Sequence, residues 1–182
     1  YCSQHSLYFF SIFFFLFIHI QIALSQPVWS DKVPQHVQVL CKNNIYPSLC
    51  VSTLNLDPRS KNSNIRGLAS ISMDATSKKV QEMLVYLIYS SKNIKDSEDL
   101  KKYKTCIDEY GSAARRFLPA SLADLKAGEF SVAKSDMKNV VLAINNCQAQ
   151  FAGSSLLAGR NKVVDDIADM TADIIKYFFA NY

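Results

Sequence analysis

The sequence predicts an all-α protein, an up-down-up-down four-helix bundle preceded by a short helical hairpin. Four amphipathic segments of about 20–30 residues follow one another with short connections, and packing their apolar faces together is the simplest way to bury them. The chain of 182 residues contains only 5 Gly and 5 Pro, and no run alternates between apolar and polar residues between hairpin turns. This composition argues against a many-turned β-sandwich.

The N-terminal segment is expected to direct the chain rather than to join the fold. Residues 7–24 form an apolar run, and no Lys, Arg, Asp or Glu precedes its end. Ala23 and Ser25 place small side chains at the third and first positions before a cut, as in secretory cleavage sites. An uncleaved membrane anchor is the alternative, because 18 residues is near the lower limit for a membrane span. We expect a signal peptide over residues 1–25, one domain over residues 26–182, and no membrane span in the mature protein.

Two short helices are expected at the start of this domain, at residues 33–43 and 47–54. Apolar side chains recur in both segments, and Pro47 suits the first turn of a helix. A turn follows, and residues 60–64 supply side chains that can cap the next helix. Together the two segments predict the helical hairpin.

Four longer amphipathic segments follow, at residues 64–92, 97–127, 131–151 and 161–179. Apolar residues recur in each at helical spacing. Pro119 is expected to kink or divide the second segment, because it lacks a backbone N–H and its ring clashes one turn back. Gly128 is expected to end that segment as a C-terminal cap. A loop is expected at residues 153–159, with Asn161 as the N-cap of the last helix.

Removal of the signal peptide leaves four cysteines, Cys41, Cys50, Cys106 and Cys147. An even number in a secreted chain favours two disulfides, and three connectivities are possible. The nine-residue separation of Cys41 and Cys50 suits a local loop, and the other two cysteines would then join two helical segments. No CxxC or Cys/His cluster is present, so the sequence predicts no metal site.

The residue inventory argues against catalysis. His36 is the only histidine after the signal segment, and its neighbours suggest a surface helix start; HExxH, Glu-x-x-His and Gly-rich phosphate-loop motifs are absent. Adjacent carboxylates occur as Asp108-Glu109 and Asp165-Asp166, but neighbours on a helix point about 100° apart, so we interpret them as solvated faces. The net charge of +4 is spread over both signs and gives no footprint for nucleic acid. The sequence predicts a binding protein with no catalytic residue, metal or cofactor.

Several short motifs occur in a fixed order along the chain. They are Tyr46-Pro47-Ser48-Leu49-Cys50, Asp57-Pro58-Arg59-Ser60, Arg66-Gly67-Leu68-Ala69, Cys106-Ile107-Asp108-Glu109-Tyr110 and Ala127-Gly128-Glu129-Phe130. With the four cysteines, this arrangement resembles the plant invertase and pectin methylesterase inhibitor family over about residues 36–180. The resemblance implies a secreted protein of the plant apoplast or cell wall, with the same fold and with disulfides Cys41–Cys50 and Cys106–Cys147. It also implies a 1:1 complex in which the bundle covers the active-site cleft of a carbohydrate-acting enzyme.

The target is indicated by two comparisons with the family. Invertase inhibitors carry Pro-Lys-Phe after the second bundle helix, and this tripeptide is absent from the matching stretch, residues 128–132. The motif at residues 106–110 resembles the Cys-Val-Asp-Glu-Tyr of pectin methylesterase inhibitors, whereas Leu118-Pro119 resembles some invertase inhibitors. We favour pectin methylesterase (pectinesterase) as the target. Acid invertase (beta-fructofuranosidase) is the alternative, and a non-inhibitory helical ligand-binding protein is a third hypothesis.

The resemblance also implies where the enzyme would be contacted. The outward faces of the second and third bundle helices would be held together by Cys106–Cys147, and polar residues lie near this bond. The expected contact residues are Asp108, Glu109, Ser112, Arg115, Arg116, Lys134, Lys138, Asn139 and Asn146.

Overall fold

The structure, a computed structural model, describes residues 33–151 and 155–180. The expected signal peptide at residues 1–25 lies outside the described residues. The described elements are α2 (Gln35–Lys42), α3 (Pro47–Leu56), the 3-10 helix η1 (Pro58–Asn62), α4 (Ile65–Ser91), α5 (Ser97–Ser112), the π-helical turn η2 (Ala113–Phe117), α6 (Leu118–Ala127), α7 (Phe130–Gln150) and α8 (Ser155–Ala180). This part of the chain is all-helical and contains no strand, which confirms the predicted fold class.

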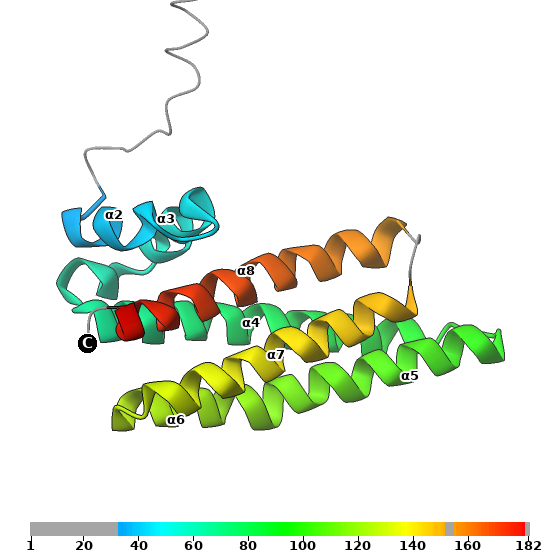
Figure 1. The fold of residues 1–182 in the computed structure, drawn as a ribbon. Helices are drawn as coiled ribbons and strands as arrows, with labels where there is room; N and C mark the ends of the chain where they lie inside the picture. The colour runs from blue at the N-terminus through cyan, green and yellow to red at the C-terminus, as the bar shows by residue number, and fades with distance from the viewer. Residues whose placement is uncertain (1–32, 152–154, 181–182) are drawn as a thin grey trace, which may run out of the picture. The chain divides into compact units, whose positions relative to one another are not determined.

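Four long helical segments form the bundle (Figure 1). α4 contacts both α5 and α8, and α7 also contacts both α5 and α8, so the four segments close into a ring. The short helices α2 and α3 pair with each other and pack on α4, and α3 also contacts α8. The architecture is therefore the predicted hairpin on a four-helix bundle.

The core fills the space inside this ring. Its largest buried side chains include Leu68, Leu87, Tyr110, Leu125, Met137, Ile144, Met170 and Ile174, each at most 1% exposed. They come from every bundle segment and recur at the spacing of one helix face. Two residues of the predicted apolar stripes point outward instead, since Ile88 is 42% and Val163 56% exposed.

Pro119 divides the second long segment, as predicted. The backbone leaves the α-helical pattern at η2, where Leu118 donates its N–H to the carbonyl of Ala113, one residue further back than in an α-helix. The wider turn comes directly before the proline, which has no N–H to donate to the carbonyl one turn back. α6 then resumes and ends at Gly128, whose φ of 86° is left-handed, as expected for a C-terminal cap.

The start of α8 differs from the sequence prediction. A loop was expected over residues 153–159, yet α8 already begins at Ser155. Leu157 is buried, and it lies four residues before the buried Asn161, so both side chains face the core from one helix face. Asn161 is therefore not an N-cap but an interior residue of α8. Residues 152–154 lie outside the described residues.

The hairpin is tied to the rest of the domain by its own disulfide and by polar contacts. Cys41 and Cys50 are bonded, with their Cα atoms 5.5 Å apart. The Asn44 side chain donates to the carbonyl of Met170 on α8 at 3.0 Å. The Nε2 atom of the half-buried His36 lies 2.7 Å from the carbonyl oxygen of Ser60. His36 thus links α2 to η1, a structural role that the sequence did not reveal.

None of the helices in the described ranges combines the length and the apolar character that a membrane span requires.

Candidate functional site

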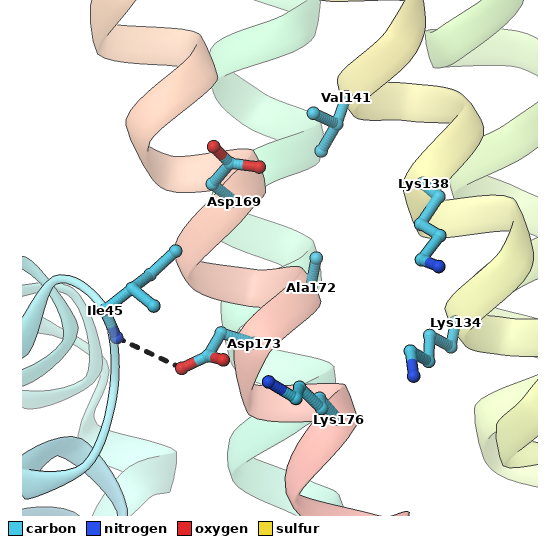
Figure 2. Close-up of a pocket in the computed structure, with 8 residues that line it drawn as sticks. All are labelled: Ile45, Lys134, Lys138, Val141, Asp169, Ala172, Asp173 and Lys176. Carbon is cyan, nitrogen blue, oxygen red and sulfur yellow. Dashed lines mark hydrogen bonds between the residues drawn. The ribbon is translucent and has the colours of Figure 1, made fainter.

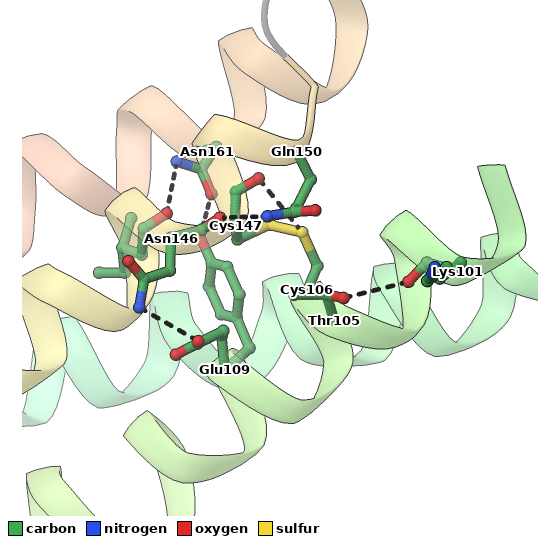
Figure 3. The surroundings of a disulfide bond; sticks show 10 residues. Lys101, Thr105, Cys106, Glu109, Asn146, Cys147, Gln150 and Asn161 are labelled. Carbon is green, nitrogen blue, oxygen red and sulfur yellow. Dashed lines mark hydrogen bonds between the residues drawn. A yellow bond between two sulfur atoms is a disulfide. The ribbon is translucent and has the colours of Figure 1, made fainter. Parts of the chain in front are cut away.

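The candidate site is built around the disulfide between α5 and α7 (Figure 3). Cys106 and Cys147 are bonded, and both are fully buried. Their Cα atoms lie only 4.6 Å apart, so the two helices are held in close contact at this point. The pairing predicted for the four cysteines is confirmed for both disulfides.

A buried hydrogen-bond network supports the same region from inside. The Tyr110 hydroxyl donates to Oδ1 of Asn161 at 2.7 Å, and Nδ2 of Asn161 donates to the carbonyl of Ile144 at 3.3 Å. Burial raises the pKa of the Tyr110 hydroxyl far above its usual range, and the nearby Asp165 carboxylate adds to this rise. The phenol therefore remains a hydrogen-bond donor, and it connects α5 to α8 while Asn161 connects α8 to α7.

On the outer side of the disulfide, polar side chains connect α5 and α7 directly. Nδ2 of Asn146 donates to Oε1 of Glu109 at 3.1 Å, one turn or less from the disulfide on each helix (Figure 3). Asp108 is exposed, and its carbonyl accepts a hydrogen bond from the Ser112 hydroxyl at 2.9 Å. The structure thus brings Glu109 and Asn146 together and places Asp108 and Ser112 beside them on α5.

Both arginines of the predicted surface lie on the π-helical turn. Arg115 and Arg116 are exposed, and the Arg116 guanidinium lies 5.2 Å from the ring centroid of Phe117. The Arg115 guanidinium lies over the buried Gly111, where a Cβ would collide with it. The absent side chain at Gly111 therefore lets this arginine lie close against α5.

The two lysines lie on a different flank of α7. Lys134 and Lys138 line a groove of about 250 Å³ between α7 and α8, together with Ile45, Val141, Asp169, Ala172, Asp173 and Lys176. Figure 2 shows both lysines on the side of α7 that faces α8. We call this feature the lysine groove.

Helix geometry separates these lysines from the asparagines of the predicted set. Asn139 and Asn146 are seven residues apart, close to two turns, and so share one face of α7. At 100° per residue, their mean direction differs by about 110° from that of Lys134 and Lys138. The four predicted residues of α7 therefore occupy two flanks of this helix, the asparagines beside α5 and the lysines beside α8.

Leu142 is a surface residue that the sequence reasoning missed. It lies three residues after Asn139 and four before Asn146, so it shares their face. Its side chain is 58% exposed although it is large and apolar. The sequence did contain an indication of this, because Leu142 is an apolar residue at a position where the amphipathic pattern of the helix predicts a polar one. We define the α5–α7 surface as Asp108, Glu109, Ser112, Arg115, Arg116, Asn139, Leu142 and Asn146.

One pair of adjacent carboxylates is not a solvated face, contrary to the sequence interpretation. Asp165 is half-buried, and its Oδ1 has no hydrogen-bond partner among the described residues. Burial raises the pKa of this carboxyl above its usual value, and repulsion from Asp169 and Asp166 adds to the effect. Asp166 itself pairs with Lys162 at 2.7 Å. Helix packing against α8, which the sequence pattern does not specify, accounts for the burial of Asp165.

Among the described residues, no three or more His, Cys, Asp or Glu side chains are placed to bind a metal ion together.

The fold and the α5–α7 surface define a class of protein, a disulfide-linked four-helix bundle with a helical hairpin and a rigid polar outer face. The chain belongs to the plant invertase/pectin methylesterase inhibitor family, whose sequence model matches residues 35–177.

Two curated proteins are similar in sequence. A protein named pectinesterase inhibitor from Actinidia deliciosa is 30% identical over 85 residues, which cover 46% of this chain and 46% of that protein. The cell wall / vacuolar inhibitor of fructosidase 1 from Arabidopsis thaliana is 25% identical over 147 residues, which cover 80% of this chain and 68% of that protein. The first match thus spans less than half of either chain, and the relatives are inhibitors of two kinds of enzyme.

Solved structures support the fold. A mutant form of a pectin methylesterase inhibitor from Arabidopsis superimposes with a TM-score of 0.67 at 19% identity, covering 78% of this chain and 95% of that one. A second pectin methylesterase inhibitor structure from Arabidopsis thaliana gives a TM-score of 0.59 at 19% identity, covering 77% and 93%.

Proposed function

We propose that this protein is a secreted inhibitor that binds pectin methylesterase in a 1:1 complex in the plant cell wall and contributes no catalysis of its own. Family membership and the names of both curated relatives support the coarser function, inhibition of a cell-wall enzyme. Beyond this function, we propose pectin methylesterase as the target and the α5–α7 surface as the region that contacts it. The domain is taken as residues 26–182, with residues 1–25 as the signal peptide.

The observation that carries this proposal is the rigidity of the α5–α7 surface. The Cys106–Cys147 bond and the Glu109–Asn146 hydrogen bond fix the spacing of the two helices. A surface that is already ordered loses little conformational entropy when it associates, so more of the contact energy is retained as affinity. The polar side chains around the exposed Leu142 match the arrangement of an apolar contact inside a polar rim. The proposed contact residues are those of the α5–α7 surface.

The packing of Phe130 favours pectin methylesterase over invertase. Its ring stacks on Phe178 with centroids 4.6 Å apart, and the Arg66 guanidinium lies 5.2 Å from the Phe130 ring centroid. This stretch follows Gly128, where invertase inhibitors carry the Pro-Lys-Phe that enters the enzyme. Here the tripeptide is absent, and the phenylalanine of the stretch packs on the bundle instead of projecting from it.

Acid invertase remains the second candidate target, because the named inhibitor of fructosidase is similar to 80% of this chain. The deciding experiment is a titration of purified plant pectin methylesterase and purified acid invertase with residues 26–182. We expect stoichiometric inhibition of the methylesterase. Inhibition of invertase alone would show that the target is wrong, and inhibition of neither would contradict the inhibitory function itself.

Asn146→Ala tests the surface in the same titration. The variant removes the hydrogen bond to Glu109 and should weaken inhibition, because a contact residue is lost and its partner carboxylate is released. Gln81→Ala removes an exposed amide from α4, away from the α5–α7 surface, and is the matched control. Equal effects of the two variants would contradict the assigned surface.

A further inference from the structure

The lysine groove lies on a different flank of α7 from the asparagines of the α5–α7 surface and has the features of a binding site of its own. Three lysines line it, Lys134 and Lys138 from α7 and Lys176 from α8. We propose that the lysine groove binds an acidic polysaccharide, a chain of sugar units that carry carboxylates. This would give the protein a second attachment, to the wall polymer rather than to an enzyme.

The spacing of the lysines suits a repeating anion. Lys134 and Lys138 are one helical turn apart, about 6 Å along α7 at 1.5 Å per residue. Figure 2 shows the two side chains one above the other on the same side of α7. Lysine binds anions as a point charge on a flexible stem, so neighbouring ammonium groups can each follow a carboxylate of one polymer.

Two carboxylates, Asp169 and Asp173, also line the groove. The lysines outnumber them, and Oδ2 of Asp173 accepts the backbone N–H of Ile45 at 3.1 Å, which directs it toward the hairpin (Figure 2). Asp169 lies at the end of the groove near Val141, away from Lys134 (Figure 2). Burial raises the pKa of Asp169 above its usual value, which further weakens its negative charge in acid.

The remaining walls favour a sugar chain over a small inorganic anion. Ile45, Val141 and Ala172 give the groove an apolar lining, against which the C–H faces of pyranose rings can pack. Its volume of about 250 Å³ is below the roughly 300–1,000 Å³ of pockets that enclose a whole ligand. It therefore suits a short stretch of a polymer lying across it.

The biological role given to this binding rests on the proposed function, whereas the binding of a polysaccharide to the lysine groove does not. Hydrolysis of a methyl ester on a polyuronate consumes water, releases methanol and leaves a carboxylate on the polymer. An inhibitor that binds this product would be concentrated where the esterase is active. The lysine groove and the α5–α7 surface lie on different flanks of α7, so both partners could be bound together.

Binding of the full chain to a fluorescent oligogalacturonate tests the inference without any enzyme. We expect measurable binding at low salt, weaker binding as salt is added, and little binding to the fully methyl-esterified oligomer of the same length. Lys134→Gln combined with Lys138→Gln should weaken binding about three- to tenfold, in line with two exposed ion pairs. Lys101→Gln combined with Lys104→Gln removes the same charge from exposed positions on α5 and should change binding little.

Equal loss in both double variants would overturn the assignment, because binding would then follow overall charge. Equal binding of the esterified and de-esterified oligomers would overturn it as well, as would absence of binding at low salt. Equally tight binding of single-stranded RNA or of anionic lipid vesicles would show a general polyanion surface and reject the polysaccharide. Failure of the enzyme titration leaves this result unaffected, so the two proposals fail separately.

Discussion

Leu142 is the large apolar side chain that the α5–α7 surface exposes to water. It is 58% exposed between two asparagines of the same helix face. Burial against an enzyme would remove this area from water, and a central apolar contact is where truncation is most costly. We predict that Leu142→Ala weakens inhibition about five- to thirtyfold, corresponding to roughly 1–2 kcal/mol.

The control for this prediction is Val163→Ala on α8. Val163 is 56% exposed, close to the exposure of Leu142, but it lies on another helix and outside the proposed surface. The inhibition constants of both variants are compared with that of the unmodified protein. A Leu142→Ala protein that inhibits as well as the Val163→Ala protein would remove Leu142 from the interface.

Asp165 is the residue at which pH should act on stability. Its folded-state pKa is raised above 3.8, mainly by burial, so the folded protein takes up this proton at a higher pH than the unfolded chain does. Above the folded-state pKa the carboxylate is ionised in both states and its burial destabilises the fold. As pH falls through that pKa toward 3.8, the destabilisation is relieved and the free energy of unfolding rises.

Asp165→Asn should therefore stabilise the protein at neutral pH and less so in acid. The measurement is the difference in the free energy of unfolding between variant and unmodified protein, from urea titrations across the acidic range. Both proteins share the other titrating groups, so their contributions to the pH dependence cancel in this difference. Asp57 is one such group, and its pKa is lowered chiefly by its hydrogen bond with Arg59. Asp108→Asn, at an exposed site, is the control. A pH-independent difference for Asp165→Asn would contradict the prediction.

At the scale of the helices, the two disulfides should differ in their effect on stability. In the chain-entropy model, the loop closed by Cys106–Cys147 gives about 4 kcal/mol, and the shorter loop closed by Cys41–Cys50 about 2.5 kcal/mol. The longer bond also joins two bundle helices, whereas the shorter one closes the hairpin. We expect paired Cys→Ala variants to follow this order in urea unfolding.

Inhibition adds a second readout for the disulfides. Loss of Cys106–Cys147 loosens the α5–α7 surface and should weaken inhibition even under conditions where the variant is fully folded. The Cys41–Cys50 disulfide lies in the hairpin, away from that surface, so its loss should affect inhibition less. Reversal of either order, in unfolding or in inhibition, would contradict the role given to the longer bond.

Helix positions followed from the sequence wherever local chemistry decides them. Proline cannot donate a backbone hydrogen bond, so the break at Pro119 was predictable, but the π-helical turn that absorbs it depends on how the flanking helices pack. Gly159 and the preceding residues suggested a loop, and burial of Leu157 overrode that local signal. Likewise, the spacing of the four candidate contact residues on α7 already divides them between two faces of that helix, but which neighbouring helix lies beside each face required the packing of α5 and α8.

At the scale of the whole molecule, the arrangement of four helices in a ring was predictable because each apolar stripe needs the other three to be buried. The relation of the two candidate surfaces was not, because periodicity identifies the buried face of a helix without identifying its neighbours. α7 contacts both α5 and α8, and its exposed ridge separates the α5–α7 surface from the lysine groove. One helix thus presents two chemically different flanks.

Net charge gives the last prediction. The chain carries +4 at pH 7, and the exposed Arg115 and Arg116 lie at the edge of the α5–α7 surface. Charges at the rim of an interface act mainly on diffusional encounter, and they are screened over about 8–10 Å at ordinary ionic strength. Added salt should therefore lower the association rate with an acidic target enzyme, while the dissociation rate changes little. Surface plasmon resonance at two salt concentrations separates the rates, and Arg115→Gln combined with Arg116→Gln should reduce the salt dependence. If salt acts on dissociation instead, the two arginines are buried in the complex, and they belong to the centre of the interface rather than to its rim.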